Sequence, residues 1–319
     1  MINPQLAILF PGQGSQSVGM LADIAAQYPE VKETFAEASA VLHYDLWQLA
    51  AFGPAEKLDQ TMYTQPALLA ASYAIWRIIA ARHPIQSVLL AGHSLGEYTA
   101  LVCANAFTFS DAIRLVAARG EYMQEAVAAG VGAMAAIIGL PDAQVAEICK
   151  QAIVSTDEVL APANFNSIGQ VVIAGHTTAV DRALVLAKEQ GAKMAILIPV
   201  SVPSHCQLML PAAARLAKLL ATISIKETNL PVINNVDVVQ YDTVDSISNG
   251  LIRQLSMPVR WVEIIEYFVK AGVTHVIECG PGKVLTGLNK RIDKNLQVMT
   301  TSDLASLEAI VNLSNARGI

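Results

Sequence analysis

Apolar residues at the start of the chain form one short uninterrupted run and then two stretches with helical spacing. Residues 6–10 are all apolar and are followed by Pro-Gly-Gln-Gly, which predicts a buried strand that ends in a loop. Residues 31–49 and 67–82 carry apolar side chains three and four positions apart, which predicts two helices. Pro66 suits the first position of the second helix.

The same alternation continues along the next part of the chain. The apolar run 87–91 predicts a strand, and residues 95–102 predict the helix that follows it. A further helix is expected to open at Ser110 and Asp111 and to run past Arg119. Strands and helices in this order predict an α/β domain with a parallel sheet covered by helices on both faces.

The pattern changes at residues 130–132, where shorter elements begin. They are expected in the order strand, helix, strand, strand, helix, strand, at residues 133–138, 141–152, 159–165, 170–174, 178–190 and 194–199. This order fits a ferredoxin-like (βαββαβ) subdomain inserted into the larger domain. We therefore expect residues 1–129 and 199–319 to form the α/β core and residues 130–198 to form the subdomain.

Long helices are expected to resume after the subdomain, with strands at 231–235 and, as the last clear strand, at 275–279. The last strand ends in Gly-Pro-Gly-Lys at 280–283. This loop is not a Walker A motif, because Ile277 stands where the first glycine is needed and Val284 follows the lysine. We interpret it as a structural strand end.

Composition narrows the classes of function. Hydrophobic residues make up 53% of the chain, but no apolar stretch approaches the roughly 18 residues of a spanning helix, so no membrane association is expected. The formal net charge of −6 argues against nucleic-acid binding. The first residues lack a basic stretch and the four cysteines lie far apart, so we expect a cytoplasmic protein with reduced thiols and no zinc site.

Residues 92–96 read Gly-His-Ser-Leu-Gly, a G-x-S-x-G pattern at the junction of a predicted strand and a predicted helix. The glycines remove side chains that would collide at such a sharp turn, so Ser94 would project its hydroxyl from it. The Leu95 amide would lie at the positive end of the helix, where it can stabilise a developing oxyanion. The pattern indicates acyl transfer through serine, although an ordinary strand-to-helix turn carries the same glycines.

A serine nucleophile needs a base, most often histidine. Among six histidines, His205 lies in a proline-punctuated loop after the predicted subdomain, where the mouth between two domains would lie. His93 is expected to support the turn beside it. His43 and His83 are expected to be solvated near helix ends.

Several short motifs follow one another along nearly the whole chain. They are Gly-Gln-Gly-Ser-Gln at 12–16, Tyr-Thr-Gln-Pro-Ala at 63–67, Gly-His-Ser-Leu-Gly-Glu at 92–97, Arg-Gly at 119–120, the segment 166–175, Pro-Ser-His at 203–205, Gln-Leu at 254–255 and Pro-Val-x-Trp at 258–261. Each motif is weak by itself, but their ordered combination closely resembles the malonyl-CoA:acyl carrier protein transacylase family. The resemblance implies a hydrolase-like parallel-sheet domain with a ferredoxin-like insertion, which agrees with the division predicted from spacing.

The resemblance also implies the catalytic residues. It makes Ser94 the nucleophile and His205 its base. No Asp or Glu between them in the chain identifies itself as a triad acid. In the family a main-chain carbonyl orients the histidine, and the matching position is near Gln254, so we assign no catalytic acid.

The oxyanion hole implied by the resemblance consists of the backbone amides of Gln13 and Leu95. Gly12 and Gly14 allow a tight loop after the first strand, beside the strand that carries the serine. The alternatives are a plain turn and a phosphate-binding loop. A dinucleotide-binding loop is disfavoured because Ser17 replaces the third glycine of its fingerprint.

Arg119 indicates the substrate. It lies on the apolar side of a predicted helix, where an unpaired guanidinium is costly to bury. The resemblance implies that it grips the free carboxylate of malonate by a bidentate pair. The alternatives are a salt bridge to a nearby acid such as Glu121 or Glu125 and a surface arginine whose charged end reaches solvent. Asn164 and Asn166, on the loop expected between two strands, either contact the pantetheine arm or are plain turn residues.

Taken together, the resemblance implies an S-malonyltransferase of fatty-acid biosynthesis. It would move malonate from malonyl-CoA through a malonyl-serine ester to the phosphopantetheine thiol of acyl carrier protein, with no metal or other cofactor. The densest basic cluster of the chain comprises Lys283, Lys290, Arg291 and Lys294. It either binds the acidic surface of the carrier protein or is a solvated helix face. The alternatives are a thioesterase or other serine hydrolase, an acyltransferase of a polyketide pathway, and a non-catalytic acyl-binding protein. A monomer is expected.

Overall fold

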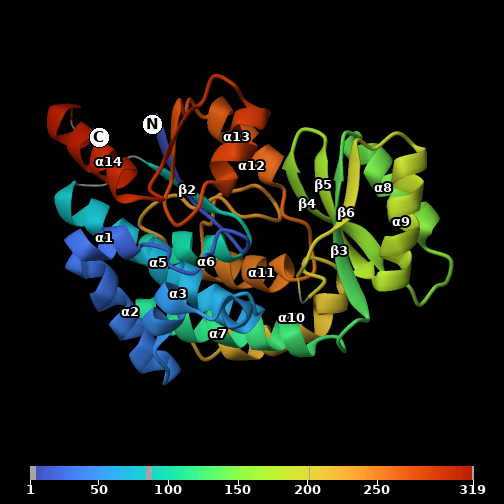
Figure 1. Ribbon diagram of the computed structural model, residues 1–319, viewed down its shortest axis with the longest axis horizontal. Helices are drawn as coiled ribbons and strands as arrows, with labels where there is room; N and C mark the ends of the chain where they lie inside the picture. Colours follow the sequence, from blue (N-terminus) through green and yellow to red (C-terminus); the bar gives the residue numbers. More distant parts are fainter. Residues whose placement is uncertain (1–4, 84–87, 201, 318–319) are drawn as a thin grey trace.

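The computed structural model describes residues 5–83, 88–200 and 202–317, which form two four-stranded sheets lying side by side (Figure 1). The first sheet is parallel, in the order β2-β1-β7-β8, with strands Leu89–Gly92, Leu6–Phe10, His275–Glu278 and Gln297–Thr300. The second is antiparallel, in the order β4-β5-β3-β6, with strands Leu160–Ser167, Gln170–His176, Gly132–Ile138 and Met194–Leu197. The protein is therefore an α/β protein with one parallel and one separate antiparallel sheet.

Alternate residues of β1 face opposite layers of helices. Ile8 and Phe10 belong to the larger apolar core, whereas Ala7 and Leu9 pack in a second core. The larger core contains residues of α1 (Ala22–Gln27), α2 (Pro29–Leu42), α3 (Leu46–Phe52), α4 (Ala55–Leu58), α5 (Thr61–Arg82), α6 (Leu95–Cys103), α7 (Phe109–Glu125), α10 (Leu210–Leu220), α11 (Val244–Gln254) and α14 (Leu304–Arg317). The second core contains residues of α12 (Trp261–Lys270) and α13 (Val284–Ile292). Helices thus cover both faces of the parallel sheet, as the sequence predicts.

The antiparallel sheet has one face covered by helices and the other turned toward the parallel-sheet region. Ile137 and Ile173 pack beneath α8 (Asp142–Ala152) and α9 (Thr177–Glu189). On the opposite face, Met134 and Val172 pack with Cys206, which precedes a short 3₁₀ turn at Gln207–Met209. The period-two alternation of these strands therefore positions one face of the sheet beside the loop that carries His205.

The helix predicted at residues 31–49 is wrong as a single element. His43 adopts a left-handed conformation, with φ of 60°, and ends α2. Asp45 then caps α3, because its carboxylate accepts a hydrogen bond from the Gln48 amide at 2.8 Å. The apolar spacing continues across this break, which is why periodicity alone did not locate it.

Two other predicted helix starts are also wrong. Helix α5 begins at Thr61, so Pro66 lies inside the helix and not at its first position. Helix α7 begins at Phe109, because the Thr108 hydroxyl accepts a hydrogen bond from the Asp111 amide at 3.1 Å and so acts as the cap predicted for Ser110.

The later strand predictions need two corrections. The strand predicted at 231–235 is reduced to two isolated bridges, a parallel one between Val232 and Leu90 and an antiparallel one between Ile233 and Gln240. The strand β7 is not the last, because β8 and α14 follow it. Strand β8 is short and lies at the sheet edge with no fully buried residue, so its sequence carries little of the apolar signal of a central strand.

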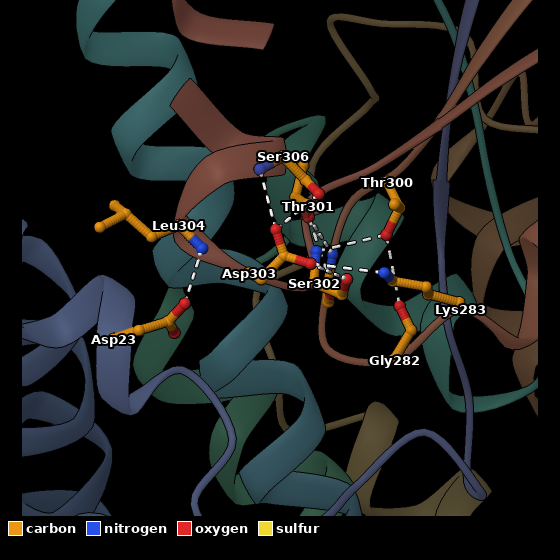
Figure 2. Close-up of polar contacts among 10 residues, drawn as sticks. Asp23, Gly282, Lys283, Thr300, Thr301, Ser302, Asp303, Leu304 and Ser306 are labelled. Carbon is orange, nitrogen blue, oxygen red and sulfur yellow. Dashed lines mark hydrogen bonds and ion pairs between the residues drawn. The ribbon is translucent and has the colours of Figure 1, made fainter. Parts of the chain in front are cut away.

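Polar contacts attach α14 to the rest of the fold (Figure 2). The Asp303 carboxylate caps the helix by accepting from the Ser306 amide at 2.9 Å, and it forms an ion pair with Lys283 at 3.4 Å. Asp23 of α1 accepts a hydrogen bond from the Leu304 amide at 2.7 Å. Hydrogen bonds from Ser306 lower the pKa of Asp303 to about 2.

Within the described ranges, no helix is both long enough and apolar enough to cross a membrane. Three predictions fall partly outside the described residues: the absence of a signal peptide (residues 1–4), the start of the strand predicted at 87–91 (Ser87), and the loop before His205 (Ser201).

Candidate active site

Ser94 lies at a strained turn between β2 and α6. Its backbone has φ of 51° and ψ of −107°, values that an L-residue seldom adopts. The flanking glycines permit this, because a Cβ on Gly96 would lie 2.0 Å from the Phe10 carbonyl oxygen and one on Gly92 would collide with the backbone of Gly96. The turn therefore needs glycine on both sides of the serine.

The structure brings His205 to this serine across 111 positions of the chain. His205 Nε2 lies 2.7 Å from Ser94 Oγ, and His205 Nδ1 lies 2.7 Å from the main-chain oxygen of Gln254. If Nδ1 donates to this carbonyl, Nε2 is left as an acceptor for the serine hydroxyl proton. A main-chain oxygen thus takes the position that a triad acid would have.

Burial keeps the histidine neutral. His205 is 3% exposed, and burial together with the nearby Arg119 charge lowers its pKa to about 3. A neutral imidazole is the form that can accept a proton, so His205 is in the protonation state that a base requires at physiological pH.

Two amides beside Ser94 are available to an oxyanion. Among the described residues, neither Gln13 N nor Leu95 N has a hydrogen-bond acceptor, whereas Ser94 N donates to Asn235 Oδ1 at 2.8 Å. The loop after β1 approaches the serine turn closely, because a Cβ on Gly12 would lie 2.4 Å from the His93 carbonyl oxygen. Gln13, Ser94 and Leu95 line the same cavity, which has a volume of about 380 Å³.

Arg119 is 1% exposed and points its guanidinium at the serine. Nη1 donates to Gln65 Oε1 at 2.8 Å, and Nη2 donates to Gln254 Oε1 at 3.0 Å and to Ser94 Oγ at 3.3 Å. Its Nε is buried without a hydrogen-bond partner in the described structure. The guanidinium therefore has neutral partners and retains donor capacity.

The sequence left open a salt bridge between Arg119 and Glu121 or Glu125. No such salt bridge is present among the described residues, and Glu125 pairs with Arg215 instead. A buried cation with spare donors at the wall of a cavity is suited to binding an anionic group.

The two asparagines lie at the edge of this cavity, and their predicted place on a loop is wrong. Asn164 and Asn166 are both part of β4, where the pairing with β5 shifts register. Asn166 Oδ1 lies 2.8 Å from His93 Nε2, and the His93 ring lies 5.4 Å from that of Trp261. Asn164 is 6% exposed and lines the cavity.

The prediction for His83 is also wrong. It is buried, and its Nε2 lies 2.8 Å from the Val311 carbonyl oxygen, so it joins α5 to α14. Of the six histidines, His205 and His93 are the two that line the cavity.

The sequence assigned no role to four polar residues around the serine, although Gln65 and Glu97 lie within two of the quoted motifs. Glu97, Asn235 and Tyr241 form a buried group behind the turn, and Gln65 holds Arg119. Glu97 had a signal, because it is a charged residue in a helix whose nine residues are otherwise uncharged. Asn235 had a weaker signal, as the second of two asparagines at the end of an apolar run.

The basic cluster lies along α13, whose Val284, Leu285 and Leu288 line the cavity. All four members are exposed. Lys283 is partly neutralised by Asp303, and Arg291 donates to Gln170 Oε1 at 2.9 Å. In the described part of the chain, no group of three or more His, Cys, Asp or Glu residues is arranged to hold a metal ion.

Comparison with known proteins defines the class. Residues 8–307 match the acyl transferase domain family. The chain is 55% identical to the malonyl CoA-acyl carrier protein transacylase of Escherichia coli strain K12. The alignment extends over 309 residues and covers 97% of this chain and 99% of the relative. A 1.7 Å crystal structure of an acyl carrier protein S-malonyltransferase from Vibrio cholerae is 59% identical, with a TM-score of 0.93 over 96% of this chain and 99% of that one.

A third relative was solved as a complex of a malonyl-transacylase with its type II PKS acyl-carrier protein. It is 51% identical, with a TM-score of 0.94 over 97% of this chain and 99% of that one. Fold and family together define an acyl transferase. The chain belongs to this family and, within it, to the malonyl-CoA:acyl carrier protein transacylases.

Proposed function

We propose that the protein transfers the malonyl group from malonyl-CoA to the phosphopantetheine thiol of acyl carrier protein in fatty-acid biosynthesis. The observation that carries the proposal is the 2.7 Å contact between Ser94 Oγ and His205 Nε2 in a cavity that also contains the guanidinium of Arg119. The names and near-complete coverage of the relatives support the same reaction.

The first half-reaction loads the serine. Ser94 Oγ attacks the thioester carbonyl while its proton passes to His205 Nε2. The Gln13 and Leu95 amides stabilise the tetrahedral oxyanion. The C–S bond then breaks, the coenzyme A thiolate takes the proton from His205, and malonate remains as a serine ester.

The second half-reaction reverses these roles. The carrier thiol gives its proton to His205 and attacks the ester carbonyl, and the proton returns to Ser94 Oγ as the C–O bond breaks. Arg119 holds the free carboxylate of malonate in both halves, which selects an acyl group that bears a charge. Asn164 and Asn166 are proposed to contact the pantetheine arm.

The proposal includes the organisation inferred from the sequence. Residues 1–129 and 199–319 form a hydrolase-like core, and residues 130–198 form a ferredoxin-like subdomain. The βαββαβ order of the elements from β3 to β6 supports the second assignment. A cytoplasmic location, as in the sequence prediction, is part of the same proposal.

The test is to incubate the protein with labelled malonyl-CoA, quench the reaction and isolate the protein. A stable label at Ser94 that is absent in Ser94→Ala and is discharged by carrier protein much faster than by water is expected. Rapid spontaneous discharge would indicate a hydrolase, and no label at all would indicate a binding protein.

The alternative acceptor is the carrier protein of a polyketide pathway. One relative was solved in complex with a type II PKS acyl-carrier protein, which supports this alternative. Comparing discharge rates with a fatty-acid carrier protein and a polyketide carrier protein decides between the two.

A further inference from the structure

Glu97 is a buried carboxylate in the first turn of α6, the helix that begins directly after Ser94. The residue is 1% exposed. Its partners among the described residues all donate: the Tyr241 hydroxyl, the Asn235 amide at 3.0 Å and Gln254 Nε2 at 2.8 Å. A carboxylate surrounded by donors is best satisfied when it is ionised, because the protonated form has a hydrogen of its own to place.

The side chain of Gln254 connects this carboxylate to Arg119. Gln254 Nε2 donates to Glu97 Oε2 at 2.8 Å and to the Ser94 carbonyl at 3.0 Å. Gln254 Oε1 accepts from Arg119 Nη2 at 3.0 Å. The two ends of an amide are not equivalent, so a reversed amide would turn its NH₂ group toward the guanidinium, donor against donor.

Charge reinforces this orientation. The negative carboxylate lies at the NH₂ end of the Gln254 amide, and the positive guanidinium lies at its oxygen end. Both charges therefore align the same dipole inside a buried region, where electrostatic interactions are strong. Glu97 also accepts a hydrogen bond from the backbone amide of Asn235. The side chain of Asn235 in turn accepts one from the Ser94 amide at 2.8 Å.

We propose that Glu97 is a positioning residue for substrate selection: its carboxylate fixes the Gln254 amide, which in turn fixes the Arg119 guanidinium for the substrate carboxylate. Glu97 thereby balances the charge of Arg119 through an intervening amide. Among the described residues Glu97 makes no direct ion pair with Arg119, so the guanidinium keeps some of its N–H donors free, including the buried Nε.

The protonation of Glu97 then affects selectivity. Burial raises the pKa of Glu97 to about 7, although Tyr241, Gln254 and Arg119 oppose the shift. Besides Arg119, the titratable groups around it are Tyr98 and Tyr241, and burial keeps both phenols neutral by raising their pKa values. Protonation below about pH 7 removes one of the two charges that align the amide.

The test compares two acyl donors that differ in the carboxylate. Because the inference rests on the proposed malonyl transfer, Ser94 acylation of the wild-type protein by malonyl-CoA and by acetyl-CoA is measured first. Glu97→Gln, which removes the charge at nearly constant size, should lower kcat/KM for malonyl-CoA about tenfold and change that for acetyl-CoA less than about threefold. In an Arg119→Ala background, Glu97→Gln should leave the malonyl-to-acetyl ratio unchanged.

Glu278 provides a matched control. It is also a fully buried carboxylate and accepts hydrogen bonds from the Leu285 and Thr286 amides at 3.0 and 2.7 Å. Glu278→Gln should reduce stability without changing the malonyl-to-acetyl ratio. The wild-type pH profile is a measurement that needs no variant: this ratio should fall as the pH is lowered from 8 to 6.

The outcomes that would overturn the positioning role of Glu97 are specific. An equal loss for both donors in Glu97→Gln would overturn the positioning role, whereas a wild-type ratio that is flat with pH would show that Glu97 stays ionised over this range. A gain in malonyl loading by Glu97→Gln would also overturn it, because Glu97 would then act only as a competing charge. A wild-type protein that forms no malonyl ester would instead overturn the proposed function, and the inference with it.

Discussion

The main-chain oxygen of Gln254 lies 2.7 Å from Nδ1 of His205, where a serine hydrolase usually has a carboxylate. A carbonyl can fix the tautomer and direction of the ring but brings no negative charge. An imidazolium at this site would therefore face a neutral carbonyl and not a carboxylate at Nδ1, and the adjacent Arg119 disfavours it further. The base is oriented by the fold of α11 and is held neutral by its surroundings.

A pH-rate profile should reveal this neutral base. Because the pKa of His205 is lowered to about 3, the reactive neutral form persists as the pH falls, and the modification of Ser94 by a neutral sulfonyl fluoride should be nearly constant from pH 8 to 5. A base with the ordinary pKa of about 6.5 would lose about thirtyfold over this range. A decline centred near 6.5 would show that His205 titrates normally.

Selection of the acyl group should depend on Arg119. Arg119→Ala should lower malonyl loading about 100-fold and acetyl loading less than about threefold, because only malonate has a carboxylate for the guanidinium to bind. Arg119→Lys should also lose most malonyl loading, since an ammonium cannot form a bidentate pair. Arg253→Ala, which removes an exposed arginine paired with Asp237, serves as the control. Equal losses for both acyl groups would exclude a carboxylate clamp.

The serine turn should not tolerate a methyl group at Gly96. An added Cβ would lie 2.0 Å from the Phe10 carbonyl oxygen, and backbone cannot move as easily as a side chain. Gly96→Ala should therefore lower the free energy of unfolding by about 3 kcal/mol or more, measured by urea denaturation, and abolish acylation.

Gly287 in α13 is the matched control, because a Cβ there meets nothing within 4 Å. Gly287→Ala should raise the free energy of unfolding by about 0.5 to 1 kcal/mol through helix propensity. Similar effects of the two substitutions would contradict the steric account of the turn.

The carrier protein should dock over α13. Lys290 and Arg291 are exposed on the helix that lines the cavity, and an acidic partner would be attracted to them. The double variant Lys290→Glu with Arg291→Glu should raise the KM for carrier protein at least about tenfold at low salt, while malonyl-CoA loading stays unchanged. Lys188→Glu on α9, remote from this helix, should leave the KM unaltered. An unchanged KM in the double variant would place docking elsewhere.

Local sequence was sufficient for several elements of the fold. The run at 6–10, the turn at 92–96 and the βαββαβ order after residue 130 all have the predicted type, because alternation, helical spacing and glycine requirements are local properties. The break at His43 and the edge strand β8 escaped prediction. The first depends on a single left-handed residue, and the second is a short strand at the sheet edge.

The candidate site likewise has a part that the sequence predicts and a part that depends on the tertiary structure. By itself the sequence determined a serine at a turn that only glycines permit, and the ordered motifs indicated its family. Only the tertiary structure decided that His205 reaches this serine from 111 positions away, that Arg119 has neutral partners, and that Glu97 lies behind Gln254. The reason is physical: a turn is set by its own backbone, whereas hydrogen-bond partners, burial and pKa values depend on segments that only folding brings together.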